Sequence, residues 1–365
     1  MKLETITQSI FDGKHGDCKN KNGSGCYFIS VKDLREYDID YSNAREIDES
    51  DFSQAYARTN LESGDTIYAN TGDTIGKSIF VVENELIKRT AFQKSLAVIK
   101  PNVEFVEPRY LYYLLKYETP RLRKAATGSG QKNLLLSTMR DFSVDIIERG
   151  KQKKLVEVLG GIDDKIRINN AINDNLQQVI KSCFDFMFAT RKPNGIISDI
   201  LQEHSKSTIQ VNDSTGVLGD YPFFTSGEAI NEWQSALVDG MNCYLSTGGN
   251  ATIKGYYGKA AYSTDTWCVC GKGEYSFYLF CYLKSIIRSI NDSFFAGSGL
   301  KHLQKDSLLL VNLYIPSEKE LEKFNSIVKP AMETMTKLFL ETKKLKQQRD
   351  FLLPLLMNGQ ATIAE

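Results

Sequence analysis

The sequence predicts an α+β protein in which two α/β domains are separated by a pair of long antiparallel coiled-coil helices, giving a dumbbell with pseudo-twofold symmetry. Two observations predict it: a heptapeptide occurs as GSGQKNL from residue 128 and as GSGLKHL from residue 297, and a long helical pattern follows each copy. The interval approaches a whole domain plus a connector and is far too long for a solenoid repeat. We expect domains at 1–150 and 191–316, helices at 151–190 and 317–358, and a tail at 359–365.

The flanks of the heptapeptide are repeated as well. Upstream, YLYYLLK ends at Lys116 and YLFCYLK ends at Lys284, and both patterns are typical of apolar helices. Downstream, DFSVDII and LVNLYIP alternate like half-buried strands. Three elements that keep their order and spacing indicate two related domains in one chain.

The two long segments carry apolar residues at alternating steps of four and three. This period is typical of a coiled-coil seam, although two separate core helices are the alternative. A second helix that pairs with the first must run antiparallel to it, which places Leu155 near Leu356 and Met187 near Leu321. The residues expected to pair the helices are Leu155, Leu159, Ile162, Ile166, Asn169, Asn173, Leu176, Ile180, Met335, Leu338, Leu345, Leu352 and Leu356.

Polar residues and helix breakers interrupt this pattern. Asn169, Asn173, Thr342 and Arg349 stand at seam positions, where polar side chains lower stability but can specify register. The Gly160–Gly161 pair costs about 1 kcal/mol per glycine in a helix interior, and Pro330 is expected to kink or interrupt its helix.

Composition narrows the class of protein. The 365 residues are 42% apolar, without an apolar run long enough to cross a bilayer and without a signal peptide, so we expect a globular cytoplasmic protein with no membrane association. Seven cysteines without CxxC spacing indicate reduced, buried thiols. The 45 basic and 45 acidic residues argue against a uniformly basic nucleic-acid binder but not against a polarised one.

Catalytic and cofactor motifs are not evident in the sequence. TGDTIGKS at 71–78 resembles a phosphate-binding loop, but its glycines enclose three residues where that loop needs four, so a hairpin tip is the better interpretation. The three histidines are scattered, which leaves few bases for a nucleophilic triad and few ligands for a metal. We therefore expect a chain that is not an enzyme and holds neither cofactor nor metal.

The Gly-rich tips instead offer groups that contact nucleic acid. Lysines can neutralise phosphates and amides can read base edges, and a lysine recurs at the same place in both copies of the heptapeptide. The alternative for each residue is a solvated turn. The candidate DNA-binding residues are Lys14, His15, Asn70, Thr71, Lys77, Lys94, Ser129, Gln131, Lys132, Thr225, Ser226, Asn250, Lys254, Ser298, Lys301 and His302.

Both long segments resemble a known family, the specificity subunits of type I restriction-modification systems. KQKKLVEVLGGIDDKIRINNAINDN is similar to the central helical region of that family, and LKQQRDFLLPLLMNGQ to its C-terminal one. SGDTIYANTGDTIGKSIFV resembles a strand and turn of its target-recognition domains.

The resemblance implies a non-catalytic subunit that reads a two-part sequence in double-stranded DNA, one half per domain, with the helices setting the gap. It also implies two modification subunits that carry S-adenosylmethionine, and restriction subunits that use ATP and magnesium. The alternatives are a non-DNA adaptor with two protein-binding domains, supported by the neutral charge, and a nucleotide-dependent enzyme, supported only by the glycine loop.

Overall fold

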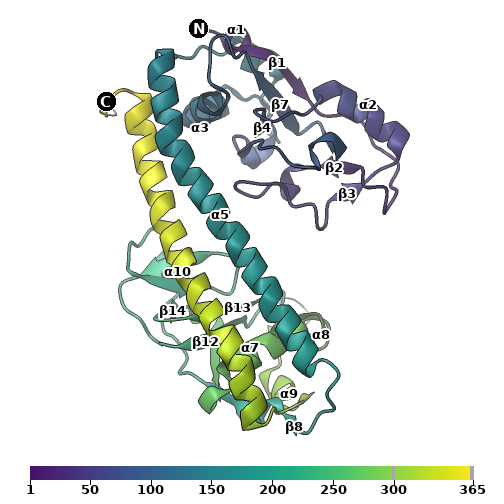
Figure 1. The fold of residues 1–365 in the computed structure, drawn as a ribbon, viewed down its shortest axis with the longest axis vertical. Helices are drawn as coiled ribbons and strands as arrows, with labels where there is room; N and C mark the ends of the chain where they lie inside the picture. Colours follow the sequence, from purple (N-terminus) through teal and green to yellow (C-terminus); the bar gives the residue numbers. More distant parts are fainter. Residues whose placement is uncertain (298, 300, 362–365) are drawn as a thin grey trace. The chain divides into compact units, whose positions relative to one another are not determined.

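The computed structural model describes residues 1–297, 299 and 301–361. The chain divides into two compact units, unit 1 being Met1–Arg167 together with the chain from Lys343 onward, and unit 2 being Ile168–Thr342. Both unit boundaries fall inside long helices, so each of these helices contributes residues to both units (Figure 1).

Unit 1 contains two small sheets. The larger one is antiparallel with the order β1-β7-β4-β5, and the smaller one has the order β3-β2-β6, with β2 and β6 parallel. Every residue of β4 is buried, as expected for a short central strand covered on both faces. The strands are β1 (Thr7–Asp12), β2 (Tyr27–Ile29), β3 (Arg45–Glu46), β4 (Thr66–Ala69), β5 (Ser78–Phe80), β6 (Thr90–Phe92) and β7 (Leu96–Pro101).

Unit 2 repeats this topology strand for strand. Its larger sheet has the order β9-β15-β12-β13 and its smaller sheet the order β11-β10-β14, with β10 and β14 parallel. The repeat predicted from the heptapeptide is therefore a repeat of the whole sheet arrangement. The strands are β9 (Leu201–Glu203), β10 (Tyr221–Phe224), β11 (Ile230–Trp233), β12 (Met241–Ser246), β13 (Ile253–Tyr257), β14 (Ala261–Tyr262) and β15 (Thr266–Gly271).

The shorter helices follow the same order in both units, with two differences. Helix α2 of unit 1 has no helical counterpart at residues 234–240, and the single helix α3 of unit 1 corresponds to the two consecutive helices α7 and α8 of unit 2. Helix α2 begins where Asp48 accepts a hydrogen bond from the Ser50 amide at 2.9 Å, and it ends at Asn60 in the left-handed region with φ 42°. The helices are α1 (Leu3–Ile6), α2 (Glu49–Thr59), α3 (Pro108–Ala125) and α4 (Leu136–Asp141) in unit 1, and α6 (Ile197–Ile200), α7 (Ser276–Ser285), α8 (Ile287–Ser293) and α9 (Lys305–Leu309) in unit 2.

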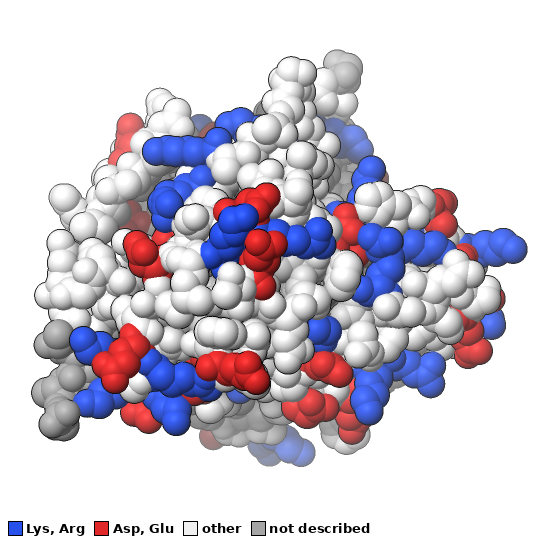
Figure 2. Space-filling view, turned by 90° about the horizontal axis from the view of Figure 1, so that it is seen from above, with Lys and Arg blue, Asp and Glu red and all other residues white. Residues whose placement is uncertain are grey.

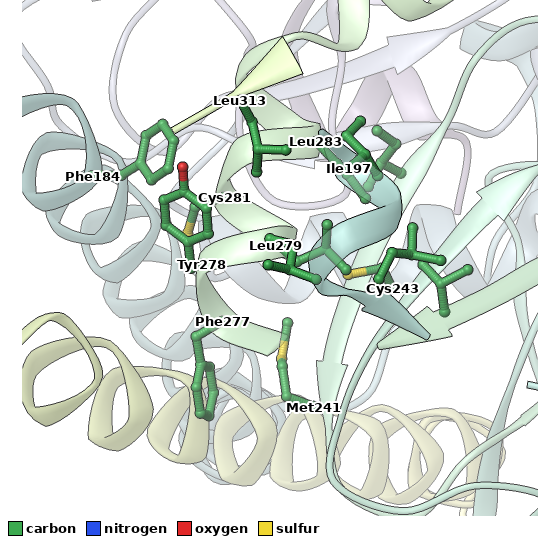
Figure 3. Packing of buried hydrophobic residues seen from close by; sticks show 14 of the residues in the cluster. Phe184, Ile197, Met241, Cys243, Phe277, Tyr278, Leu279, Cys281, Leu283 and Leu313 are labelled. Carbon is green, nitrogen blue, oxygen red and sulfur yellow. The ribbon is translucent and has the colours of Figure 1, made fainter. Parts of the chain in front are cut away.

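Helix α7 forms the centre of the unit 2 core. Figure 3 shows its Leu279 packed beside Cys243 of β12, while Tyr278 lies against Phe184, with ring centroids 5.7 Å apart. Two short strand pairs complete this unit, namely β8 (Gly195–Ile196) with β18 (Asn312–Leu313) and β16 (Phe295–Ala296) with β17 (His302–Leu303).

The two long helices are α5 (Arg149–Phe188) and α10 (Glu318–Met357), each of 40 residues. Both helices are continuous: α5 runs through Gly160 and Gly161, and α10 runs through Pro330, where a kink or an interruption was expected and no interruption occurs. Gly160 has a packing reason, because a Cβ there would lie 3.1 Å from the Arg109 guanidinium. That guanidinium forms two hydrogen bonds to Asp164, at 2.8 and 3.0 Å.

The antiparallel pairing of these helices is confirmed within each unit. In unit 1, Leu155 and Leu159 of α5 share a core with Leu356 of α10. In unit 2, Met187 of α5 packs against the core that contains Leu321 of α10. The start of each helix therefore lies beside the end of the other (Figure 1).

Polar seam positions are paired across the two helices. Asn169 donates to Glu341 at 2.8 Å and to Thr342 at 3.3 Å in unit 2, and Arg349 contacts Asp163 at 3.4 Å in unit 1. Of the residues expected in the seam, Leu155, Leu159, Ile166, Asn169, Ile180 and Leu356 are buried, whereas Ile162, Asn173, Leu176, Met335, Leu338, Leu345 and Leu352 are partly exposed.

Neighbouring residues take some of the deeper positions. Asp163 is buried where Ile162 is partly exposed, and Leu353 is buried where Leu352 is partly exposed. A helix that turns every 3.6 residues drifts by about 20° per heptad from a strict seam. Both long helices also pack into the cores of unit 1 and of unit 2. At some positions the deeper side chain is therefore the neighbour of the residue that the strict heptad pattern predicts.

All seven cysteines are free thiols. Among the described residues, no helix combines the length and apolarity needed to cross a bilayer. Within the same part of the chain, no cluster of three or more His, Cys, Asp or Glu side chains could hold a metal ion.

Candidate nucleic-acid interface

In unit 1, three segments distant in sequence meet at the tip that follows β4. The Asn70 amide donates to the Ser95 carbonyl at 3.1 Å, which joins the tip to the turn before β7. The Gly72 amide donates to the Lys132 carbonyl at 2.7 Å, and the Leu134 amide donates to the Asn70 carbonyl at 2.8 Å. Backbone bonds thus fasten the GSGQKNL segment to this tip.

Unit 2 builds the same arrangement with the same three kinds of bond. The Thr247 backbone amide donates to the Asp265 carbonyl at 3.2 Å, and the Gly249 amide donates to the Lys301 carbonyl at 2.9 Å. The Leu303 amide donates to the Thr247 carbonyl at 3.0 Å. The heptapeptide is therefore the clamp that holds each tip. Its lysines are equivalent in structure as well as in sequence.

Glycine is required where the clamp closes. Gly72 and Gly249 have φ angles of +67° and +79°, in the left-handed region that favours glycine. A Cβ on Gly72 would lie 3.1 Å from the Gln131 amide nitrogen, so the Gln131 side chain lies directly over this glycine. The tip thus positions Gln131 as well as its own backbone.

Several candidate residues remain exposed beside the clamps. Lys77 also donates to the Val31 carbonyl at 3.3 Å, which ties its ammonium loosely to unit 1. The Thr71 side chain is half-buried and lies 3.4 Å from Asn133, a residue that the sequence argument did not include. Apart from His15, which lies elsewhere, the exposed candidates are Lys77, Lys94, Ser129, Gln131, Lys132, Asn250, Lys301 and His302.

Three candidates point inward and serve the fold. Asn70 is 4% exposed. With its side-chain amide turned so that the nitrogen faces acceptors, that nitrogen lies 2.7 Å from the Ser95 carbonyl and 3.3 Å from the Lys94 carbonyl. Thr225 is also 4% exposed and donates to the Ala229 carbonyl at 2.7 Å. The Lys254 ammonium donates to the carbonyls of Thr225 and Gly227, and burial lowers its pKa. In this structure none of the three side chains is free to meet a base.

The remaining candidates are engaged in contacts or lie elsewhere. Lys14 forms an ion pair with Asp51 at 2.8 Å, and the hydrogen bond between them raises the pKa of Lys14. His15 lies 2.7 Å from an Asp12 carboxylate oxygen. Ser226 is half-buried, and its carbonyl accepts from Thr252 at 3.1 Å. Ser298 lies outside the described residues.

Comparison with known proteins finds similarity to one family. A model described as the type I restriction modification DNA specificity domain matches residues 13–178. The type I restriction enzyme MjaIX specificity subunit of Methanocaldococcus jannaschii is 21% identical over 94% of this chain and 88% of its own length. The HindI specificity subunit of Haemophilus influenzae is 27% identical over 49% of this chain, but that match spans only 35% of the relative.

The chain is similar to the specificity subunits of type I restriction-modification systems. The fold agrees, because the S subunit of such a system from M. genitalium superposes with a TM-score of 0.62 over 98% of this chain and 95% of its own, at 13% identity.

The chain also contains a tip residue that was not among the sequence candidates. Thr247 is the structural equivalent of Asn70. The backbone amide of each donates to the turn before a central strand, and the carbonyl of each accepts from the last leucine of the heptapeptide, Leu303 or Leu134 respectively. The signal was available in the register, since YANTG and LSTGG place Asn70 and Thr247 two residues before their respective glycines 72 and 249.

The charged side chains on the face seen in Figure 2 are mixed in sign. Figure 2 shows lysine and arginine side chains interspersed with aspartate and glutamate over the face it views. At the unit 1 tip, Asp73 is exposed beside Lys77, and in unit 2 Asp265 is exposed beside the clamp. At the two tips, short lysine-bearing loops are positive features available to a phosphate backbone.

Proposed function

We propose that this chain is a specificity subunit that reads a bipartite sequence in double-stranded DNA, with one clamped tip in each unit reading one half. The observation that carries the proposal is the repeated set of three backbone bonds, which presents Lys132 in unit 1 and Lys301 in unit 2 from equivalent positions. Gln131 precedes the first of these lysines in the chain, and His302 follows the second. Lysines there would neutralise phosphates, while the amide and imidazole groups would meet base edges.

The chemistry would be supplied by other chains. We propose that two modification subunits, which bind S-adenosylmethionine, and restriction subunits, which use ATP and magnesium, assemble with this chain in the cytoplasm. The domains proposed for reading are 1–150 and 191–316, with the helical segments 151–190 and 317–358 as the spacer and 359–365 as the tail. In this proposal the chain contributes recognition and no catalytic group.

Sequencing of methylated positions in cells that express the complete system tests the proposal. The wild-type system is expected to yield a two-part motif. Gln131→Ala is expected to relax one half and His302→Ala the other, because the two side chains lie in different units. A motif in which both halves change together in either variant would contradict the assignment of one half to each unit.

A direct binding measurement separates this proposal from a non-DNA adaptor. The full chain with its modification subunits is titrated with duplex that carries the methylated motif and with scrambled duplex. Tighter binding to the motif by a factor of 10³ or more is expected of specific recognition. Equal or undetectable binding to both duplexes would favour the adaptor.

A further inference from the structure

Unit 2 contains an apolar groove that the proposed DNA-reading role does not use. Its volume is about 590 Å³, and it lies between the C-terminal half of α5, the N-terminal half of α10, β13 and α7. Every lining residue belongs to unit 2. The apolar lining includes Ile180, Phe184, Phe280, Met332, Met335 and Phe339.

The repeat shows what occupies the equivalent place in unit 1. Counted from the first residue of each long helix, Ile180 of α5 corresponds to Arg349 of α10, and Met332 of α10 corresponds to Asp163 of α5. In the helical motifs that end at Lys116 and Lys284, Phe280 corresponds to Tyr112. Polar residues of unit 1 are therefore matched by apolar residues that line the groove of unit 2.

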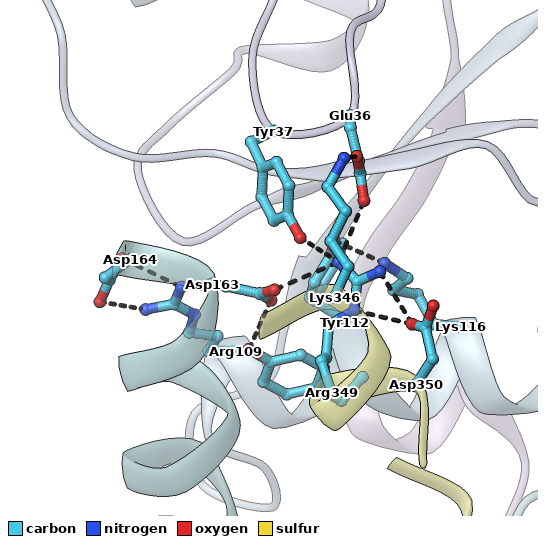
Figure 4. Close-up of polar contacts among 11 residues, drawn as sticks. Glu36, Tyr37, Arg109, Tyr112, Lys116, Asp163, Asp164, Lys346, Arg349 and Asp350 are labelled. Atoms are coloured by element: carbon cyan, nitrogen blue, oxygen red, sulfur yellow. Dashed lines mark hydrogen bonds and ion pairs between the residues drawn. The ribbon is translucent and has the colours of Figure 1, made fainter. Parts of the chain in front are cut away.

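In unit 1 these positions are covered by a loop of the chain itself. Glu36 and Tyr37 lie in the segment 30–44 between β2 and β3 and reach the long helices (Figure 4). Arg349 donates to Glu36 at 3.1 Å and to the Tyr37 hydroxyl, and Lys346 pairs with Glu36. The loop thus places an aromatic side chain beside a carboxylate on the helix pair.

Unit 2 lacks this cover for two reasons. The segment between β10 and β11 is only 225–229, and Lys254 holds it back through hydrogen bonds to the carbonyls of Thr225 and Gly227. The third residue of β5 is Phe80, whereas the third residue of β13 is Gly255. The Phe280 ring lies over Gly255, so closely that a Cβ on this glycine would be 2.4 Å from the ring. A short loop and a missing side chain leave the groove open.

We propose that the groove binds an extended segment of a partner protein, one that inserts an apolar side chain between Ile180 and Met332 and sets a carboxylate beside Lys284. The apolar side chain follows from the replacement of Arg349 and Asp163 by Ile180 and Met332. The carboxylate follows from the lysines that line the groove. Lys181 is paired with Asp185 at 2.5 Å, and the Lys254 ammonium faces carbonyls. Lys284 is exposed and has no ion pair in the described part of the chain, so it is the lysine that a carboxylate of the partner would meet. This interaction goes beyond DNA reading and does not depend on it.

Two labelled peptides based on the chain's own covering loop test the proposal by fluorescence anisotropy with the full-length protein. One is the natural sequence of residues 33–41, DLREYDIDY, and the other carries Glu36→Leu and Tyr37→Phe, giving DLRLFDIDY. Both keep three aspartates for Lys284. The apolar peptide is expected to bind at least tenfold more tightly than the natural one, and equal or absent binding of the two would overturn the proposal.

Variants of the protein place the binding in the groove. Met335→Glu adds a negative charge to the lining and is expected to weaken binding of the apolar peptide tenfold or more, while Thr334→Glu adds the same charge one residue away at an exposed position and should leave it unchanged. Met335→Gln serves as a milder variant if Met335→Glu unfolds, as judged by circular dichroism. Lys284→Glu should weaken binding several-fold.

The same measurements distinguish other occupants. Undiminished binding in both Met335 variants would refute the proposal. Sedimentation of the free chain shows whether a second copy fills the groove. If the chain forms a dimer that blocks peptide binding, and if Met335→Glu dissociates that dimer, the occupant is another copy of this chain. That outcome would overturn the assignment to a different partner. A monomer that binds the apolar peptide supports it.

Discussion

The backbone amide of Gly249 donates to the carbonyl of Lys301 at 2.9 Å, and this bond holds the second heptapeptide against the tip that follows β12. Gly72 and Lys132 form the same bond in unit 1. A lysine whose backbone is held in this way presents its side chain from a defined point, which is what recognition of a phosphate requires.

Replacement of either clamp lysine is expected to weaken DNA binding without changing the sequence that is read. Lys132→Ala and Lys301→Ala should each lower affinity for all duplexes and reduce the slope of log K against log salt by about one, because one phosphate contact is lost. Titration at several salt concentrations measures both effects. Lys329→Ala, at an exposed site on α10, is the control, and an equal loss in that variant would show that only net charge matters.

Substitution of the clamp glycines should separate stability from reading. Gly72→Ala and Gly249→Ala each place a side chain at positive φ, at a cost of about 1–2 kcal/mol in the free energy of unfolding. Only Gly72→Ala also meets a side chain, that of Gln131, whereas a Cβ on Gly249 meets nothing within 4 Å. The methylated motif is expected to relax in one half for Gly72→Ala and to stay intact for Gly249→Ala. An unchanged motif in Gly72→Ala would show that Gln131 does not read a base.

The pair formed by Arg349 and Asp163 should behave as a buried ion pair. The two side chains are 6% and 2% exposed, and Tyr113 also donates to Asp163 at 2.7 Å. Arg349→Met is expected to destabilise the protein by about 3–5 kcal/mol, because Asp163 is left as a buried charge without its partner. Urea unfolding followed by circular dichroism measures the loss.

The double variant and a surface control sharpen this test. Asp163→Leu combined with Arg349→Met should recover most of the stability, since no buried charge remains. Lys346→Met, at a side chain that is 38% exposed, should cost less than about 1 kcal/mol. Additive losses in the double variant would contradict coupling between Arg349 and Asp163.

The covering loop 30–44 should loosen in acid. Burial would raise the pKa of Glu36, but the hydrogen bond from Lys346 and the charges of Lys346 and Arg349 outweigh it, so the pKa lies below its usual 4.5. A carboxyl with a lowered folded pKa stabilises the fold above its unfolded pKa and loses that contribution as pH falls through the folded value. Hydrogen exchange of residues 30–44, corrected for intrinsic rates, should therefore show less protection at pH 3 than at pH 7.

Glu36→Gln is the matched control for this prediction. It removes the ionisable group, so the loop should be less protected at pH 7 and its protection should change less with pH. Asp40 remains charged at pH 3, because hydrogen bonds from Ser42 and Arg35 lower its pKa to about 2, so the internal bonds of the loop are expected to persist. Equal pH dependence in wild type and Glu36→Gln would assign the loosening to another group.

The sequence by itself determined the internal repeat, the two long helices and their antiparallel pairing. These features rest on local periodicity and on motif spacing, which short-range sterics and burial of an apolar stripe translate directly into helices and strands. The heptad count from Leu155 to Leu356 therefore predicted which helix ends meet. The same periodicity could not show that Asp163 and Leu353 would take deeper positions than their neighbours.

Only the tertiary structure decided which polar residues face solvent and which face inward. Asn70 looked like a base-reading amide, but carbonyls from the turn that contains Lys94 and Ser95 surround it, and those residues lie far along the chain. Likewise, the sequence around Ile180 and Met332 looks like ordinary core, and the groove is open because segment 225–229 is too short to cover them and Gly255 adds no side chain. Such outcomes depend on contacts between distant segments, and a local pattern does not encode the geometry of those contacts.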